Sequence, residues 1–473
     1  MKITESIIWR SEAEKPLFFE KGFRKGFWKS FSKKTALFSA VLPLLLCLSG
    51  CAAFDAPLEG MLSPPKLTKT QTEIYNALTL NIGEQSELIY PKSGEFRSPF
   101  VLFNMDGEPT DEAVVFYREK SPDPDTVSGL RMNLLDLIEG QWVSVADKAL
   151  SGADIERVSF YDFGGGINMM ISSSFLGQSE TALSVMTYSE SYLEELYKTT
   201  YSYMDRYDVN DDGFEELFLV HYDPALETNV AYLVGQSKKE EEQNRFGPLS
   251  SAELASDMAS VQRLTRQKIK EGYFLLYIDY AKGDNVYGTQ LLSCYSDNLL
   301  SISLDKDTSR RYNSNIPMLY STDIDGDGRV EIPVTSPMLG YEGLTVPEQM
   351  LEVDWLVINE ESVLTASLKY RTYISTGYEY IFYFPVRWQD FVTVQKTENN
   401  TVNFTLYDMN TFADVMLSVR VADEPPEEEG WEHYGDNGSK IYIKTPDADA
   451  PMAFTPDELN SSLYIVPKRS DSK

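Results

Sequence analysis

The stretch Asp208-Val-Asn-Asp-Asp-Gly-Phe-Glu-Glu-Leu-Phe-Leu-Val220 joins a polar, glycine-containing loop to an apolar run. An apolar run that is rich in β-branched and aromatic residues and bounded by Asp, Asn and Gly predicts a β-strand. A second stretch, Asp323-Ile-Asp-Gly-Asp-Gly-Arg-Val-Glu-Ile-Pro-Val334, has the same layout. The same loop-and-strand unit therefore occurs at two places in the chain.

Three weaker copies begin at Asn104, Asp162 and Asp279. The five markers are 44 to 71 residues apart. A repeat of this length, with several short strands in each unit, predicts a β-propeller or a related β-array. We predict an all-β (mainly β) fold in which residues 96–377 form the propeller-like repeat body.

The longest separation suggests an inserted helix. Ser250 and Glu253 have the spacing of a capping box, an apolar stripe follows, and Gly272 would end the helix. We expect this helix over residues 250–272 to pack on the β body as a lid or brace; the alternative is a helix that binds a partner.

The two intact loops have the composition of a cation site. Their oxygen-bearing side chains fall at alternate positions of a tight glycine turn, which suits the six to eight oxygen ligands that Ca²⁺ takes. The alternative is a metal-free turn, because Asp, Asn and Gly form tight turns unaided. We expect structural Ca²⁺ in these two loops and none in the three weaker ones. The candidate ligands are Asp208, Asn210, Asp212, Glu216 and the carbonyl of Phe214, and Asp323, Asp325, Asp327, Glu331 and the carbonyl of Arg329.

The first nine loop positions resemble an EF-hand, but position 12 is Leu219 or Val334 in place of the bidentate Glu, and a strand follows in place of a helix. The pattern is similar to the integrin-type FG-GAP and VCBS repeats. This resemblance implies that five units over about residues 96–340 are propeller blades and that the loop residues bind Ca²⁺. The chain differs in having Glu at position 9 and in lacking the Gly-Ala-Pro element.

The two ends of the repeat body have other characters. Residues 51–95 read as a tether followed by a short helix over Thr70–Ile82, with apolar residues at a spacing of four. Residues 378–473 contain several strand-like runs and a short helix beginning at Thr455. We interpret this region as a small C-terminal β-rich domain; the alternative is that it contains the last blades of the same body.

The charge of the chain is divided unevenly. The formal net charge is −31, with 42 Lys and Arg against 73 Asp and Glu, but residues 1–50 carry nine basic and four acidic residues. The remainder therefore carries −36, which argues against nucleic-acid binding, since phosphate recognition needs clustered basic residues. A basic segment followed by an apolar run is typical of an export signal.

The apolar run ends in Leu48-Ser-Gly-Cys51, which resembles the bacterial lipobox. The resemblance implies that residues 1–50 are a lipoprotein signal peptide and that Cys51 becomes the lipid-bearing N-terminus. The protein would then be anchored to the cell membrane on its extracytoplasmic face. The alternative is an uncleaved anchor helix, because the uncharged run is barely long enough to span a bilayer.

Enzyme motifs are missing from the sequence: it has no Gly-x-Ser-x-Gly, His-Glu-x-x-His or P-loop. We expect His221 and His433 to be surface or packing residues, and Cys294 to be a buried, inert thiol. The leading hypothesis is a non-enzymatic lipoprotein that binds a protein or a glycan. A carbohydrate-active hydrolase or lyase, and a purely structural envelope protein, are the alternatives.

Overall fold

A computed structural model describes residues 67–83, 86–119, 129–223, 225–237, 245–283, 286–301, 313–359, 365–375, 377, 379–397, 399–446, 452–454 and 456–466. The predicted signal, Cys51 and the first part of the tether lie outside these residues. None of the described helices is long and apolar enough to cross a membrane.

The strands of the described residues form six antiparallel sheets. The first contains β1 (Ser86–Leu88), β2 (Phe100–Phe103), β3 (Glu112–Glu119), β4 (Leu130–Ile138) and β5 (Gln141–Ala149). The second contains β6 (Asp154–Asp162), β7 (Ile167–Ser174), β8 (Thr181–Ser189) and β9 (Tyr192–Tyr201). The third contains β10 (Tyr203–Tyr207), β11 (Glu216–Asp223), β12 (Thr228–Gln236) and β13 (Phe246–Glu253).

The fourth sheet contains β14 (Ser260–Lys270), β15 (Tyr273–Gly283), β16 (Val286–Tyr295), β17 (Asn298–Ser301) and β18 (Asn313–Ser314). The fifth contains β19 (Glu331–Pro337), β20 (Leu351–Asn359), β21 (Thr365–Ile374), β22 (Tyr380–Tyr383) and β28 (Leu463–Ile465). The sixth contains β23 (Val392–Thr397), β24 (Thr401–Asp408), β25 (Thr411–Ala422), β26 (Glu432–Asp436) and β27 (Lys440–Lys444). The helices are α3 (Lys69–Ile82) and α4 (Pro456–Ser462), with short 3₁₀ turns η2 (Val346–Glu348) and η3 (Val386–Trp388).

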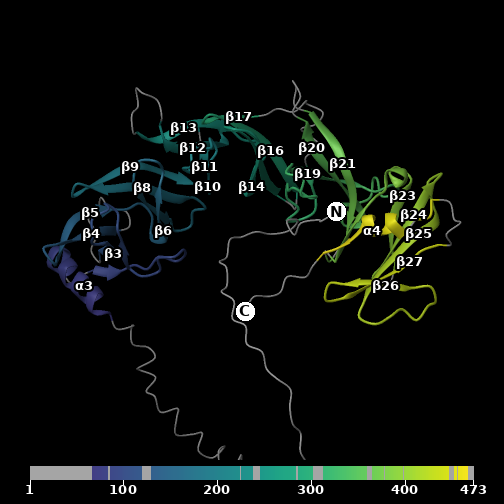
Figure 1. Cartoon of the computed structure of the whole chain (residues 1–473), viewed down its shortest axis with the longest axis horizontal. Coiled ribbons are helices and arrows are strands. Elements are labelled where there is room, and N and C mark those ends of the chain that lie inside the picture. The colour runs from purple at the N-terminus through teal and green to yellow at the C-terminus, as the bar shows by residue number, and fades with distance from the viewer. Residues whose placement is uncertain are drawn as a thin grey trace, which may run out of the picture.

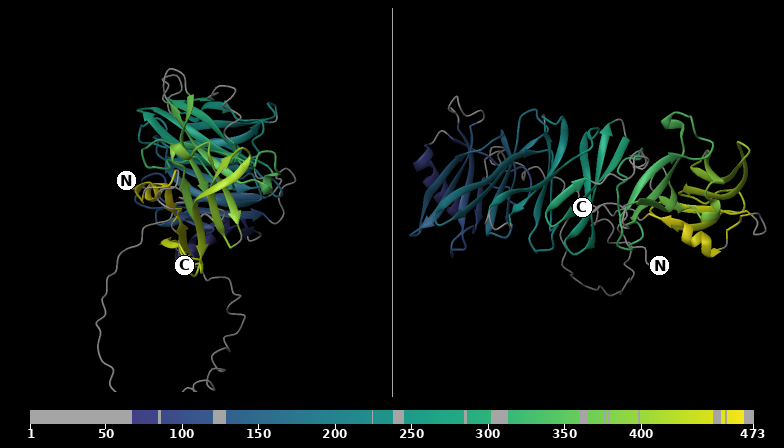
Figure 2. Two further views of the ribbon diagram at one scale, coloured as in Figure 1. Left: turned by 90° about the vertical axis from the view of Figure 1, so that its right-hand side faces the viewer. Right: turned by 90° about the horizontal axis from the view of Figure 1, so that it is seen from above.

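The six sheets follow one another in chain order along an arc, with the first and the sixth at its two ends (Figure 1). Seen from above, they stand side by side in a row (Figure 2). Most strands pair with their neighbours in the sequence, so each sheet is built chiefly from one continuous segment, as a propeller blade is. The prediction of a mainly β, propeller-like repeat body is confirmed.

The hydrophobic core is divided among the spaces between successive sheets. Val114 and Phe116 of β3 pack with Met169 of β7 between the first and second sheets. The opposite face of the same strand, including Tyr117, packs against Ile74 of α3. A strand that is covered on both faces needs a continuous apolar run, which explains why these segments do not alternate with polar residues.

Helix α3 was predicted from the sequence and is present with a full capping box. The Thr68 side chain accepts the Gln71 N–H at 3.2 Å, and the Gln71 side chain accepts the Thr68 N–H at 3.0 Å. Gly83, with φ of 81°, follows the last turn. The helix therefore begins and ends where its sequence signals lie and covers the outer face of the first sheet.

The inserted helix expected over residues 250–272 is wrong. Ser250 and Glu253 belong to β13, a turn follows, and residues 260–270 form β14. The apolar spacing that suggested a helix arises because Leu254 and Met258 flank the turn and pack in the same core as Leu264 of β14. Tertiary packing, and not helical periodicity, accounts for the stripe.

The last part of the chain contributes to two sheets. Strand β22 pairs with β21, and β28 pairs with β22, so both complete the fifth sheet. The fifth and sixth sheets also share a core in which Phe382 and Phe404 are 4.2 Å apart between ring centroids. The sequence boundary at residue 378 therefore falls inside the fifth sheet.

Candidate functional site

In three loops of the chain, a buried glutamate at the start of the following strand accepts a hydrogen bond from the loop backbone. Glu112, Glu216 and Glu331 are the first residues of β3, β11 and β19, and their exposed fractions are only 1%, 5% and 0%. In each case Oε2 accepts the backbone N–H of the second loop residue. The donors and N···O distances are Met105 at 2.6 Å, Val209 at 3.1 Å and Ile324 at 3.0 Å. A carboxylate at position 9 thus joins the start of the loop to the strand that follows.

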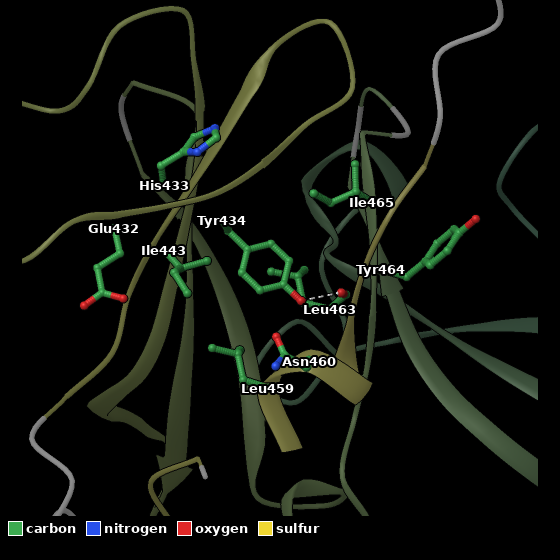
Figure 3. A pocket seen from close by; sticks show the side chains of 9 residues that line it. All are labelled: Glu432, His433, Tyr434, Ile443, Leu459, Asn460, Leu463, Tyr464 and Ile465. Atoms are coloured by element: carbon green, nitrogen blue, oxygen red, sulfur yellow. Dashed lines mark hydrogen bonds between the residues drawn. The ribbon is translucent and has the colours of Figure 1, made fainter. Parts of the chain in front are cut away.

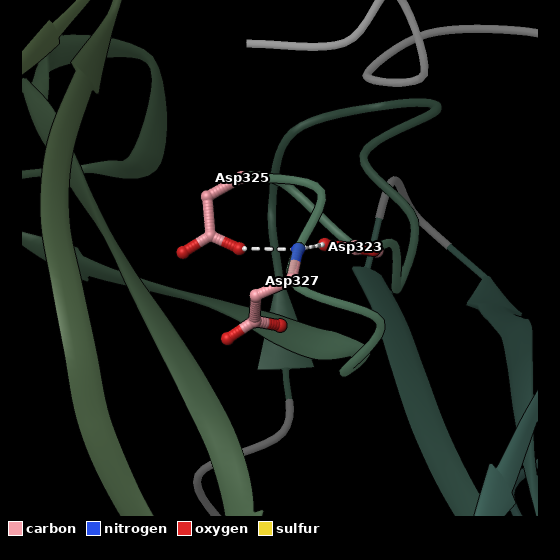
Figure 4. A group of neighbouring side chains, drawn as sticks. All are labelled: Asp323, Asp325 and Asp327. Atoms are coloured by element: carbon pink, nitrogen blue, oxygen red, sulfur yellow. Dashed lines mark hydrogen bonds between the residues drawn. The ribbon is translucent and has the colours of Figure 1, made fainter. Parts of the chain in front are cut away.

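In the loop from Asp323, the carboxylates of three aspartates converge (Figure 4). One ligand atom each from Asp323, Asp325 and Asp327 lies within 4.8 Å of the others, and no other such group of Asp, Glu, His or Cys occurs in the described residues. Asp323 accepts backbone N–H groups from Gly326 at 2.7 Å and Gly328 at 2.8 Å. The backbone of the loop also donates to one oxygen of Asp325, at 3.2 Å, and to one oxygen of Asp327, at 2.8 Å, so only their second oxygens can face a cation.

The cation in this loop is supplied by the chain itself. The ammonium of Lys369, on β21, lies 2.9 Å from Asp325, 2.7 Å from Asp327 and 2.8 Å from Glu331. Burial disfavours the charged ammonium, but the hydrogen bonds to these carboxylates outweigh it and raise the pKa of Lys369. The hydroxyl of Tyr370 donates to Asp325 at 2.7 Å. The residues predicted to bind Ca²⁺ at positions 3, 5 and 9 are thus the acceptors of one lysine, and the loop does not fit a metal ion in this arrangement.

In the loop from Asp208, the neighbouring lysine is Lys268, and it pairs at 2.6 Å with Asp211, which is not one of the predicted ligands. The two carboxylate oxygens of Asp208 accept the backbone N–H groups of Asp212 at 3.2 Å and of Gly213 at 3.0 Å. The amide Nδ2 of Asn210 donates to Glu216 at 2.8 Å and to Asp297 at 2.7 Å. Asp297 follows β16 in the fourth sheet, so a carboxylate from the next sheet joins the predicted group.

The electrostatics of Glu216 follow from this crowding. Burial is the main cause that raises its pKa to about 7, and the nearby carboxylates of Asp297, Asp212 and Asp208 add to the shift against the Val209 N–H. A cation would relieve that repulsion. Carboxylates are therefore crowded at this loop, and Asn210 places its amide nitrogen, and not its oxygen, between Glu216 and Asp297.

The weaker loops have different structures. Glu112 closes the Asn104 loop, but its Oε1 has no hydrogen-bond partner among the described residues. Asp162 accepts N–H groups from Gly164 and Gly166 at 2.8 and 3.1 Å. Asp279 is not in a loop: it lies inside β15, is buried, and accepts hydrogen bonds from Thr289 and Ser321. The fourth marker was therefore misplaced, and Asp284 of the same copy lies outside the described residues.

Two pockets lie near the fifth and sixth sheets. One, of about 320 Å³, is bordered by the Asp323 loop, β22, η3 and the end of α4. Its walls are mainly aromatic and apolar, and its lining residues include Asp325, Lys369, Tyr370, Tyr383, Phe384 and Gln389. We call it the fifth-sheet pocket. The Tyr370 and Tyr383 rings meet edge to face with centroids 5.5 Å apart.

The other pocket, of about 550 Å³, lies between β26, α4 and β28 (Figure 3). The Tyr434 hydroxyl donates to the backbone carbonyl of Leu463 at 2.9 Å within it. His433 borders this pocket and lies 3.3 Å from Asp436 at its exposed edge. The wide opening and the use of Tyr434 as a structural bond make this a less suitable binding site than the fifth-sheet pocket.

The two histidines and the remaining cysteine have structural surroundings. His221 Nδ1 lies 3.2 Å from Glu180 and 3.1 Å from the Thr200 hydroxyl. One nitrogen thus faces both groups, so the three do not form a nucleophile–base–acid relay, in which the two ring nitrogens have separate partners. Cys294 is fully buried, and burial raises the pKa of its thiol to about 12, as expected of an inert cysteine.

Sequence reasoning missed Lys369, Asp297 and the fifth-sheet pocket. Lys369 lies between Leu368 and Tyr370 in a strand, where a lysine reads as a solvent-facing residue. Asp297 lies in a turn with no special composition. Each reaches its loop through strand register and sheet packing, which leave no local signal in the sequence.

No family model and no curated protein matches this chain. Several solved structures with β-propeller-like folds are similar to it. A putative 6-phosphogluconolactonase from Bacteroides fragilis shares 8% identity, with 70% of this chain and 93% of that chain covered and a TM-score of 0.22. Sqt1 from Saccharomyces cerevisiae shares 10% identity, with coverage of 74% and 96% and a TM-score of 0.26.

An α-L-arabinanase from Penicillium chrysogenum, complexed with arabinobiose, shares 10% identity, with coverage of 76% and 98% and a TM-score of 0.19. Similarities at these TM-scores say nothing about the function of this chain. The fold stated above rests on the strand order and the packing of the sheets.

Proposed function

We propose that this protein is a membrane-anchored extracytoplasmic lipoprotein whose β-sheet body is a binding module and not an enzyme. The observation that carries this proposal is the state of the charged groups around the fifth-sheet pocket. Asp325 is paired with Lys369 and accepts the Tyr370 hydroxyl, so these groups already satisfy one another. A general acid or base has to be able to exchange its proton with a substrate. Asp325, Lys369 and Tyr370 are poorly suited to that task, because their polar atoms are already bonded to one another.

The uncharged groups of the pocket suit a neutral ligand. No described residue forms a hydrogen bond with the Tyr383 hydroxyl or the Gln389 side-chain amide, and both line the pocket with the apolar Phe384. Aromatic faces combined with a few amide and hydroxyl groups are the usual means of holding an uncharged polar ligand. A short glycan fits this chemistry best, and an uncharged segment of a partner protein is the second candidate.

The binding proposal is tested by screening the full-length protein, in detergent, against an array of neutral and charged glycans. We expect binding to neutral oligosaccharides. Tyr383→Phe and Gln389→Ala should each weaken binding about three- to tenfold, the value of one hydrogen bond. Asn460→Ala, in the other pocket, is the matched control. Binding that is unaffected by both fifth-sheet variants would refute this site, and hydrolysis of the bound glycan would favour the hydrolase alternative.

The anchoring proposal rests on the lipobox-like sequence and has its own test. Cys51 should incorporate a labelled fatty acid in bacterial cells, and Cys51→Ser should abolish both the label and the recovery of the body in the membrane fraction. Cys47→Ser is the control and should change neither. Incorporation that persists in Cys51→Ser would contradict the proposed lipid attachment.

Calcium remains part of the proposal for the Asp208 loop. The residues that would hold the ion are Asp208, Asn210, Asp212 and Glu216, together with the Phe214 carbonyl. There Ca²⁺ would be structural, offsetting carboxylate repulsion and fixing the loop. Millimolar Ca²⁺ should then raise the melting temperature of the wild-type protein, and Asp208→Asn/Asp212→Asn should remove that response. In the Asp323 loop, the Lys369 ammonium occupies the corresponding centre.

A further inference from the structure

We infer that the Asp323 loop carries its own counter-ion, the Lys369 ammonium, and folds without a metal ion. Three carboxylates that would otherwise repel one another share this one cation at 2.7–2.9 Å. The side chain of Lys369 is 17% exposed and that of Glu331 is fully buried, so water screens these contacts weakly. The loop has the sequence of a calcium loop and the structure of an ion-paired one.

Lys369 reaches the loop because it is the extra residue of a β-bulge. Trp355 of β20 pairs with Tyr370, and Leu356 pairs with Leu368, which leaves Lys369 unpaired between them. A bulge bends the strand and redirects the side chain of the extra residue. In this case the side chain is directed to the end of the sheet at which β19 leaves the loop.

The third sheet has the same bulge at the same place but with a different residue. Leu233 of β12 pairs with Ser250, and Val234 pairs with Pro248, so Leu249 is the extra residue. The registers correspond, because Val234 pairs with Leu217, directly after Glu216, as Leu356 pairs with Ile332, directly after Glu331.

The first sheet repeats the arrangement a third time. Leu134 pairs with Ala146 and Leu135 with Ser144, so Val145 is the extra residue. Leu135 also pairs with Ala113, directly after Glu112. The three loops therefore share one scaffold, in which a buried glutamate and a bulged residue occupy matched positions. Of these three sheets, only the fifth has a basic residue, Lys369, at the bulged position.

The physical consequence is a competition between Lys369 and any divalent ion. A metal ion at positions 3, 5 and 9 would need the same oxygens that the ammonium contacts, so the ammonium would have to leave first. Lys369 is attached to the sheet, so its local concentration is set by the fold, whereas Ca²⁺ must be drawn from solution. The wild-type loop therefore favours its own lysine.

The test compares calcium binding by the full-length protein, in detergent, for four variants, using titration calorimetry with CaCl₂ alone and melting curves in EDTA and in millimolar Ca²⁺. The first comparison is wild type against Asp325→Asn. We expect the two to bind the same number of Ca²⁺ ions. A site that is present in the wild type and lost in Asp325→Asn would overturn the inference.

The second comparison is Lys369→Leu, which copies the third sheet, with and without Asp325→Asn. We expect Lys369→Leu to melt several degrees lower in EDTA, to bind one more Ca²⁺ than wild type, and to regain its stability in Ca²⁺. Adding Asp325→Asn should remove the extra ion. An unchanged melting temperature together with unchanged calcium binding would overturn the inference.

The control is Lys268→Leu, which removes an exposed lysine from its pair with Asp211, a residue of the Asp208 loop that is not a predicted ligand. It should change neither the stability in EDTA nor the number of ions bound. If Lys369→Leu does not fold in EDTA, folding restored by Ca²⁺ supports the inference. Failure to fold in both conditions, combined with a calcium site in wild type that Asp325→Asn removes, overturns it.

Discussion

Glu331 and Lys369 are in direct contact, with Oε1 of the carboxylate 2.8 Å from the ammonium nitrogen. The other oxygen of Glu331 accepts the Ile324 N–H at 3.0 Å. One fully buried side chain therefore joins a loop, the strand that follows it and a strand two places away in the same sheet.

Glu331→Ala should destabilise the protein by about 2–4 kcal/mol, because it leaves a buried N–H and an ammonium without their acceptor. Glu331→Gln should cost less, since its amide oxygen can still accept the Ile324 N–H. Urea unfolding gives the stability change, and hydrogen exchange at Ile324 gives the local effect. Glu215→Ala is the control: Glu215 pairs with Arg206 at the surface, and its loss should cost less than about 0.5 kcal/mol. Equal effects of the Glu331→Ala and Glu215→Ala variants would contradict the role assigned to Glu331.

Glu112→Gln should change how stability depends on pH. Burial is the main cause that raises the pKa of Glu112 from its ordinary 4.5 to about 7, so the folded state holds a proton that the unfolded state has released between these values. The contribution of Glu112 to the stability of the wild type should therefore fall as the pH rises from 4.5 through 7. Glu112→Gln has no carboxyl at this position and does not lose this contribution. Its free energy of unfolding should exceed that of the wild type by up to about 3 kcal/mol at pH 8, and the difference should disappear below about pH 4.5.

The measurement is urea unfolding of both proteins at several pH values. Glu108→Gln, at an exposed position of the same loop, is the matched control and should show a pH dependence like that of wild type. A constant difference between Glu112→Gln and wild type across the range would mean that the carboxyl of Glu112 does not titrate as described.

Gly340→Ala should destabilise the protein more than Gly343→Ala. Both glycines have positive φ, 85° and 82°, so both substitutions impose the cost of about 1 kcal/mol for an L-residue in that conformation. A Cβ on Gly340 would also lie 2.7 Å from the Tyr407 ring, whereas one on Gly343 would meet nothing within 4 Å. The clash should add about 1–3 kcal/mol, which comparison of the two melting temperatures would show. Equal melting temperatures would indicate that the Tyr407 ring moves freely.

Cys294 should resist alkylation in the folded protein. The thiol is fully buried, and burial raises its pKa to about 12, so little thiolate forms and reagents cannot reach it. In a variant with Cys47 and Cys51 replaced by serine, maleimide should label no cysteine in buffer and one cysteine in urea. Rapid labelling in buffer would show that the core between the third and fourth sheets opens.

The sequence predicts the local elements of this protein well. Helix α3 has its capping box in four consecutive residues, Thr68 to Gln71, and the apolar runs after the Asp208 and Asp323 loops are long enough to identify β11 and β19. Each of these elements is specified by the side chains of its own short segment, so the local sequence is enough to predict it.

Features that depend on sheet register were not predictable in the same way. Lys369 meets Asp325 only because β21 bulges against β20, and Asp297 meets Asn210 only because two sheets pack together. The helix predicted over residues 250–272 was wrong for a related reason. The apolar residues of this segment pack in one core from two strands and a turn, and their spacing resembles the apolar stripe of a helix.

Strand β28 has a consequence for the order in which the molecule can assemble. The fifth sheet begins at Glu331, yet its last strand is supplied by residues 463–465, after the whole sixth sheet. The first four sheets can each pair their strands from one continuous stretch as it emerges, but the fifth must wait for the end of the described chain. A newly made chain would thus expose an unpaired edge at β22 until residues 463–465 arrived, and a chain truncated before Leu463 would lack the strand that pairs with it.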